Sequence, residues 1–157
     1  MTAQANHRSK IQESQFVAEL STVLGLPENP AHAEKVLCAV FQLIRERVPP
    51  IASSAIITTL PIEIKKLYMA GWNRKFFPKK DFDYEQFIDS LYDFKGREHY
   101  RLFSSKRQVK ESVSVIFEVI KRYVSHRQYA TMMSLMPLLF RINLSVDYIF
   151  EEQSYFL

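Results

Sequence analysis

The chain has 157 residues, of which 47% are apolar and 24% charged, with 3 glycines and 1 cysteine. A chain of this length buries about two-thirds of the surface that its unfolded form exposes, so it can fold without disulfides or metal. The low glycine content disfavours phosphate-binding loops and small β-sandwiches. The net charge of +4 is lower than we expect of a dedicated nucleic-acid-binding protein.

Apolar residues recur at helical spacing along the chain, and no segment alternates as a strand would. We therefore predict an all-α fold without a sheet. The expected helices cover residues 12–24, 31–48, 50–59, 61–70, 83–94, 106–124, 126–135, 137–143 and 145–152.

Residues that begin and end helices support these boundaries. Asn29 and Pro30 form an N-cap followed by a proline at the first helical position. Gly25 and Gly96 are expected to be left-handed C-caps, and Pro61 and Pro137 to open helices. Three pairs have the spacing of a capping box: Asp83 with Gln86, Ser105 with Gln108, and Ser125 with Gln128.

The sequence repeats itself at a shift of 76 residues, which aligns Val36–Tyr68 with Ser112–Leu144 without a gap. An earlier segment repeats at a shift of 71 residues, which aligns Phe16 with Phe87. We therefore expect one domain, residues 1–157, made of two tandem four-helix units packed as a single bundle. The expected units are residues 12–72 and 83–148, joined by a basic and aromatic connector, residues 73–82.

The first unit contains a recognisable motif, Leu60-Pro61 followed by Leu67-Tyr68-x-x-Gly71-Trp72, after Arg47-Val48-Pro49. It resembles a bacterial tandem helical-repeat family known as a domain of unknown function. The resemblance covers residues 12–145 and implies an all-helical fold, but no activity or catalytic residue. The motif residues are Leu60, Pro61, Tyr68, Gly71 and Trp72. The second unit departs from the motif, because Leu144 replaces the tyrosine.

We find no constellation of residues typical of an enzyme. The four histidines are scattered, and none forms a metal-binding motif; His32 and Glu28 are four residues apart, but Pro30 lies between them. No phosphate loop, nucleophile elbow or metalloprotease helix is present. We therefore expect no catalytic residue, metal or cofactor. Cys38 is expected to be a core residue rather than a nucleophile.

Glu85, Asp89 and Asp93 form an acidic stripe, with Asp81 and Asp83 just before it. Such a stripe could hold a cation or carry out acid–base chemistry. We favour the interpretation that these charges complement a helix N-terminus.

Residues 65–110 hold 12 basic and 6 acidic residues, with aromatic residues among them. Basic side chains release counterions from a polyanion, and aromatic rings stack on unpaired bases. The candidate anion contacts are Lys65, Lys66, Arg74, Lys75, Lys79, Lys80, Lys106 and Arg107. We favour the alternative that the aromatic rings anchor this segment to the core while its charges are solvated.

The segment that follows residue 131 is apolar nearly all round, with Met132, Met133 and Met136 at its start. Either the C-terminal helix or a second subunit must cover it. No stretch approaches the roughly 20 apolar residues of a membrane span. We expect a non-catalytic cytoplasmic module that mediates protein–protein or self-association. The alternative is nucleic-acid or anionic-surface binding through residues 65–110.

Overall fold

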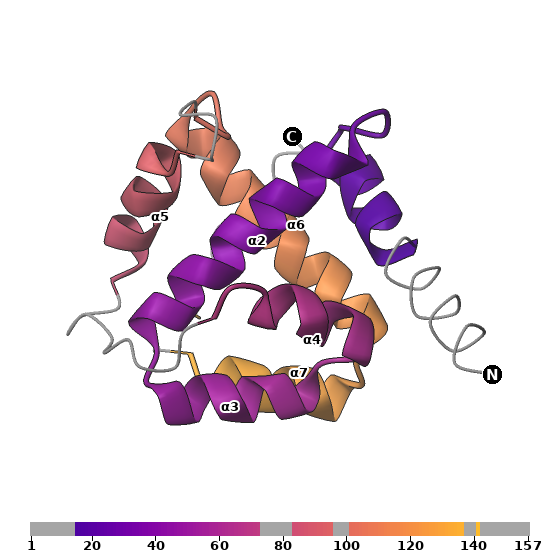
Figure 1. Cartoon of the computed structure of the whole chain (residues 1–157), viewed down its shortest axis with the longest axis vertical. Coiled ribbons are helices and arrows are strands. Elements are labelled where there is room, and N and C mark those ends of the chain that lie inside the picture. Colours follow the sequence, from indigo (N-terminus) through magenta and orange to yellow (C-terminus); the bar gives the residue numbers. More distant parts are fainter. Residues whose placement is uncertain (1–14, 73–82, 96–100, 137–140, 142–157) are drawn as a thin grey trace, which may run out of the picture.

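The structure is a computed structural model that describes residues 15–72, 83–95, 101–136 and 141. The described chain is built of helices (Figure 1). Within these residues, β-type backbone pairing is limited to one isolated antiparallel bridge between Lys95 and Arg101. The predicted all-α fold is confirmed.

The described part of the first helix is residues 15–23. The later helices are α2 (Pro30–Arg47), α3 (Pro50–Thr59), α4 (Ile62–Met69), α5 (Tyr84–Asp93), α6 (Lys106–Tyr123) and α7 (His126–Ser134). Each labelled helix begins and ends within a single residue of its predicted position. The helix expected over 145–152 and most of the one expected over 137–143 lie outside the described residues.

The caps explain why these boundaries could be predicted. The Asn29 side chain accepts a hydrogen bond from the His32 N–H at 3.2 Å and begins α2. Gly25, with φ of +79°, ends the first helix in the predicted left-handed conformation. Pro61 is the N-cap of α4, as expected. Gly96 and Pro137 lie outside the described residues.

One of the three predicted capping boxes forms completely, between Ser125 and Gln128. The other two predictions are wrong in part. Ser105 accepts from the Gln108 N–H, but the Gln108 Oε1 accepts instead from the Ser104 N–H at 2.6 Å. The Asp83 carboxylate accepts from the Glu85 N–H, one residue earlier than a capping box requires.

The helices surround one apolar core. In Figure 1 the two long helices α2 and α6 cross in the middle of the view, and α3 and α7 lie side by side. Helix α5 packs against both α2 and α6, and α4 packs against α2. Cys38, on α2, is half-buried and packs against this core. The largest fully buried side chains include Phe16, Leu37, Ile44, Tyr68, Tyr84, Phe87 and Leu91.

The helix boundaries follow the 76-residue shift found in the sequence. Helices α2 and α6 each contain 18 residues, and the shift places one exactly over the other. It also places Pro49, the N-cap of α3, over Ser125, the N-cap of α7.

Candidate functional site

The acidic stripe of α5 faces basic side chains at and before the start of α6. Within the described residues each acid is paired: Glu85 with Lys110 at 3.3 Å, Asp89 with Lys106 at 2.7 Å, and Asp93 with Arg101 at 3.5 Å. The hydrogen bond from Lys106 to the Asp89 carboxylate raises the pKa of that lysine. Exposed pairs of this kind each contribute little stability. The stripe therefore serves the contact between α5 and α6, in addition to any effect on a helix N-terminus.

The same pairs occupy part of the predicted anion-binding set. Lys106 bonds Asp89, and the Arg107 Nε lies 3.1 Å from Glu111 Oε1. Lys65 and Lys66 lie on α4, away from the start of α6 in Figure 1. Arg74, Lys75, Lys79 and Lys80 lie outside the described residues. The part of the set that the structure describes does not form one continuous unpaired track.

Tyr68, the motif tyrosine, is 1% exposed and joins three helices. Its hydroxyl on α4 lies 2.9 Å from the Ser53 Oγ on α3, in a buried hydrogen bond. Its ring is 5.1 Å from the Phe41 ring on α2, measured between centroids. Trp72 meets the Tyr68 ring edge-on at 6.4 Å and is half-buried. Burial raises the pKa of Tyr68 to about 12.

The rest of the motif shapes the two ends of α4. Leu60 and Pro61 separate α3 from α4, because proline opens a helix readily and cannot continue one. Gly71, with φ of +70°, turns the chain after α4. The Arg45 Nη1 donates to the Ala70 carbonyl at 2.8 Å at this end of the helix. The contacts of the motif residues are thus those of a helix junction.

Sequence reasoning missed a polar cluster that attaches the first helix to α6. Glu19 accepts hydrogen bonds from Arg122 at 2.6 Å and from the Tyr123 hydroxyl at 2.5 Å. The Phe16 ring packs edge-on against Tyr123. The hydrogen bond from Tyr123, followed by the one from Arg122, lowers the pKa of Glu19. No local spacing could indicate this cluster, because more than 100 residues separate its members.

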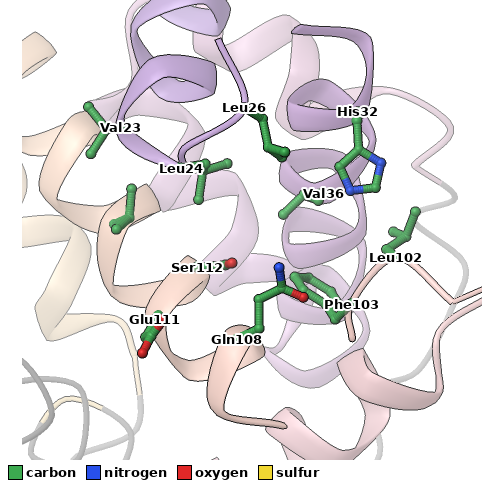
Figure 2. Close-up of a pocket in the computed structure, with 11 residues that line it drawn as sticks. Val23, Leu24, Leu26, His32, Val36, Leu102, Phe103, Gln108, Glu111 and Ser112 are labelled. Atoms are coloured by element: carbon green, nitrogen blue, oxygen red, sulfur yellow. The ribbon is translucent and has the colours of Figure 1, made fainter. Parts of the chain in front are cut away.

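A pocket of about 150 Å³ opens where the first helix, α2 and α6 meet (Figure 2). His32 and Val36 line it from α2, and Gln108 and Ser112 from α6. The other lining residues are Val23, Leu24, Leu26, Leu102, Phe103, Glu111 and Val115. No motif signals this pocket, because its walls come from four separate segments of the chain.

A second surface feature lies on α3 and at the start of α4. Ile51 is 80% exposed and Ile62 is 59% exposed. Between Val48 and Ile62 the sequence carries no charged residue. The two isoleucines stand near opposite ends of α3, and the uncharged segment between them makes the exposed side of α3 a candidate contact surface.

The described residues hold no cluster of three or more His, Cys, Asp or Glu side chains that could bind a metal ion. Among the same residues, no helix combines the length and apolar character that crossing a membrane requires.

Comparison with curated proteins finds no significant match to the sequence. A protein-family model, described as "Uncharacterized conserved protein (DUF2267)", matches residues 13–141. This match covers most of the chain and includes each of α2 to α7. The resemblance to a domain of unknown function is therefore confirmed, and the chain belongs to the DUF2267 family.

Proposed function

We propose that this protein is a non-catalytic helical module that acts by self-association in the cytoplasm, and that α3 supplies the contact surface. The observation that carries the proposal is Ile51, an isoleucine with 80% of its surface in water. Exposing a large aliphatic side chain forfeits roughly 1.5–3 kcal/mol that its burial would supply. A partner surface would recover that free energy.

The exposed side of α3 is a narrow uncharged stripe. Ile51, Ala55 and Thr58 follow the spacing of one helix face, and Ser54 lies beside them. Each of these residues is exposed or half-buried. The opposite face, which includes Ser53 and Ile56, is buried in the core. The stripe is therefore available without any rearrangement of the fold.

A second copy of the chain is the partner that this stripe fits. In a twofold dimer the same patch meets itself, so the patch must be self-complementary. An uncharged patch meets this condition, because it brings no like charges together and buries no unpaired charge. Polyanion binding through residues 65–110 gains no comparable support, since Lys106 and Arg107 already bond carboxylates.

We also propose that the chain is two tandem copies of one unit, residues 12–72 and 83–148, joined by 73–82. The matched boundaries of α2 and α6 support this arrangement. So does a pair of contacts: Glu19 bonds Tyr123, and Ser90 accepts from Arg47 at 2.7 Å. The 71-residue shift places Glu19 over Ser90, and the 76-residue shift places Arg47 over Tyr123, so the two contacts occupy equivalent positions. In each copy, the first helix then packs against the long helix of the other copy: the helix before α2 packs against α6, and α5 packs against α2.

Sedimentation equilibrium of the full chain and of Ile51→Glu tests self-association. We expect a dimer for the wild type and a monomer for the variant, because a buried unpaired carboxylate costs several kcal/mol. Glutamate is well tolerated near the start of a helix, so the variant should fold. Circular dichroism checks this.

Ala31→Glu is the matched control, because Ala31 is exposed in the first turn of α2 and lies off the stripe. It adds the same charge and should leave the dimer intact. A wild type that stays monomeric at every concentration contradicts the proposal. So does a dimer that both variants weaken equally.

A further inference from the structure

The pocket between the first helix, α2 and α6 has a size that suits a small organic molecule. Its volume is about 150 Å³. An engineered apolar cavity of about this size binds benzene. Among the lining residues, Val23 is 40% exposed and Val36 is 3% exposed. The pocket therefore reaches from solvent to the core, and a ligand can enter it.

The walls of the pocket combine apolar and polar surface, and their apolar side is held in place by the backbone. Leu24 and Leu26 come from the turn that follows the first helix, and Phe103 from the segment before α6. The turn is fixed by the Leu26 N–H, which donates to the Ser21 carbonyl at 2.8 Å. The Ser21 hydroxyl donates in turn to the Leu26 carbonyl. A preformed apolar wall lowers the entropic cost of binding.

Two polar groups on α6 have hydrogen-bonding capacity that no described residue uses. Ser112 is 8% exposed, and its hydroxyl has no hydrogen-bond partner among the described residues. The Gln108 Oε1 is held by the Ser104 N–H and hydroxyl, at 2.6 and 3.0 Å, which leaves its Nε2 without a partner in the described chain.

Figure 2 shows the Ser112 hydroxyl and the Gln108 amide nitrogen pointing into the ring of lining side chains. The two residues are four apart, so they are neighbours on one face of α6. Ser112 is largely buried, but its hydroxyl lies at the pocket surface, where a ligand oxygen can replace water as its hydrogen-bond partner. Both groups can donate to the same oxygen atom of a ligand.

The charges around the pocket favour a neutral ligand. Glu111 lies on α6 next to Ser112, and Arg107 at 3.1 Å balances its charge. An anion placed against Ser112 would meet the Glu111 carboxylate, and Lys110, two residues from Ser112, is already paired with Glu85. A cation would find Glu111, the carboxylate that lines the pocket, already paired with Arg107.

We propose that this pocket binds a small neutral molecule that carries an aromatic or branched aliphatic group and one hydrogen-bond-accepting oxygen. The apolar group packs against Leu24, Val36 and Phe103, and the oxygen accepts from Ser112 and Gln108. This site is independent of the α3 stripe, so either proposal can fail without the other.

Benzyl alcohol is a suitable probe, because it joins a benzene ring to a neutral hydroxyl group. We expect saturable shifts of pocket amides in ¹⁵N–¹H spectra of the full chain, with a Kd of about 1 mM. Benzoate has nearly the same shape but is an anion, and we expect it to bind at least about tenfold more weakly.

Ser112→Ala removes the proposed donor and should weaken benzyl alcohol binding about three- to tenfold. Ser114→Ala is the matched control: Ser114 is also a buried serine of α6, but it does not line the pocket. Its binding should equal that of the wild type. Gln108→Leu is a second test on an exposed residue and should also weaken binding.

Several results would overturn the proposal. One is the absence of saturable shifts at the pocket residues up to about 20 mM benzyl alcohol, well above the expected Kd. Another is an equal effect of Ser112→Ala and Ser114→Ala. Benzoate that binds as tightly as benzyl alcohol would overturn the assignment of a neutral ligand.

Discussion

The buried hydrogen bond between Ser53 and Tyr68 allows a quantitative test of the role of the family motif. Ser53 is 0% exposed and Tyr68 is 1% exposed, so water cannot replace either partner. Tyr68→Phe removes one hydroxyl and leaves the Ser53 hydroxyl buried without its partner. Such a change costs about 1–3 kcal/mol of the free energy of unfolding. For a chain of this size, about 1.5 kcal/mol lowers the melting temperature by roughly 3–6 °C.

A double-mutant cycle separates this bond from the packing of the ring. Ser53→Ala should cost a similar amount, because it leaves the Tyr68 hydroxyl unpaired. The double variant removes both hydroxyls and should lose less than the sum of the two single changes, with a coupling of about 1 kcal/mol. Urea unfolding followed by circular dichroism measures each value.

Tyr129→Phe is the control for loss of a tyrosine hydroxyl. Tyr129 is half-buried, and its hydroxyl has no hydrogen-bond partner among the described residues. We expect a change below about 0.5 kcal/mol. If Tyr68→Phe were as mild as this control, or if the cycle were strictly additive, the hydrogen bond would not hold α4 against α3. The motif would then need another explanation.

Three further predictions concern stability. Tyr68, Tyr123 and Tyr129 each have a pKa raised to about 12 from 10.0, chiefly by burial, so the unfolded chain ionises first. The contribution of these tyrosines to the free energy of unfolding should be fully present below pH 10 and should fall as the pH rises toward 12. An unchanged urea midpoint across that range would refute this. Gly71→Ala should cost about 1 kcal/mol, because its φ of +70° strains an L-residue although the space around it is open. Ser114→Ala should raise the unfolding free energy by up to about 1 kcal/mol, because the Ser114 Oγ is buried without a hydrogen-bond partner in the described chain. Thermal melts of Gly71→Ala and Ser114→Ala must shift in opposite directions.

The helices could be predicted within a residue because their determinants are local. Asn29, Gly25 and Pro61 act on the backbone within one turn, and the apolar period is visible in any short window. The failure at Gln108 is also local. Two donors, the N–H groups of Ser104 and Ser105, compete for one amide oxygen, and spacing alone does not decide between them.

The charges show where prediction from sequence stops. Helical spacing correctly placed Glu85, Asp89 and Asp93 on one face of α5. It could not show that Lys106 and Lys110 reach the same face, because that depends on how α5 packs against α6. In this part of the chain, the candidate acidic site and part of the candidate basic site are therefore the two sides of one contact between α5 and α6.

The pocket lies where the two copies of the proposed duplication carry different side chains. The 76-residue shift that matches Phe41 with Phe117 in the core also matches His32 with Gln108 and Val36 with Ser112. The core pair is identical, and both rings are buried. The pocket pairs differ: Gln108 stands where α2 has His32, and Ser112 offers a hydroxyl where α2 offers the apolar side chain of Val36. A ligand with one polar end therefore fits in one orientation. A symmetric pocket built from two identical units would bind the same ligand equally well in two opposite orientations.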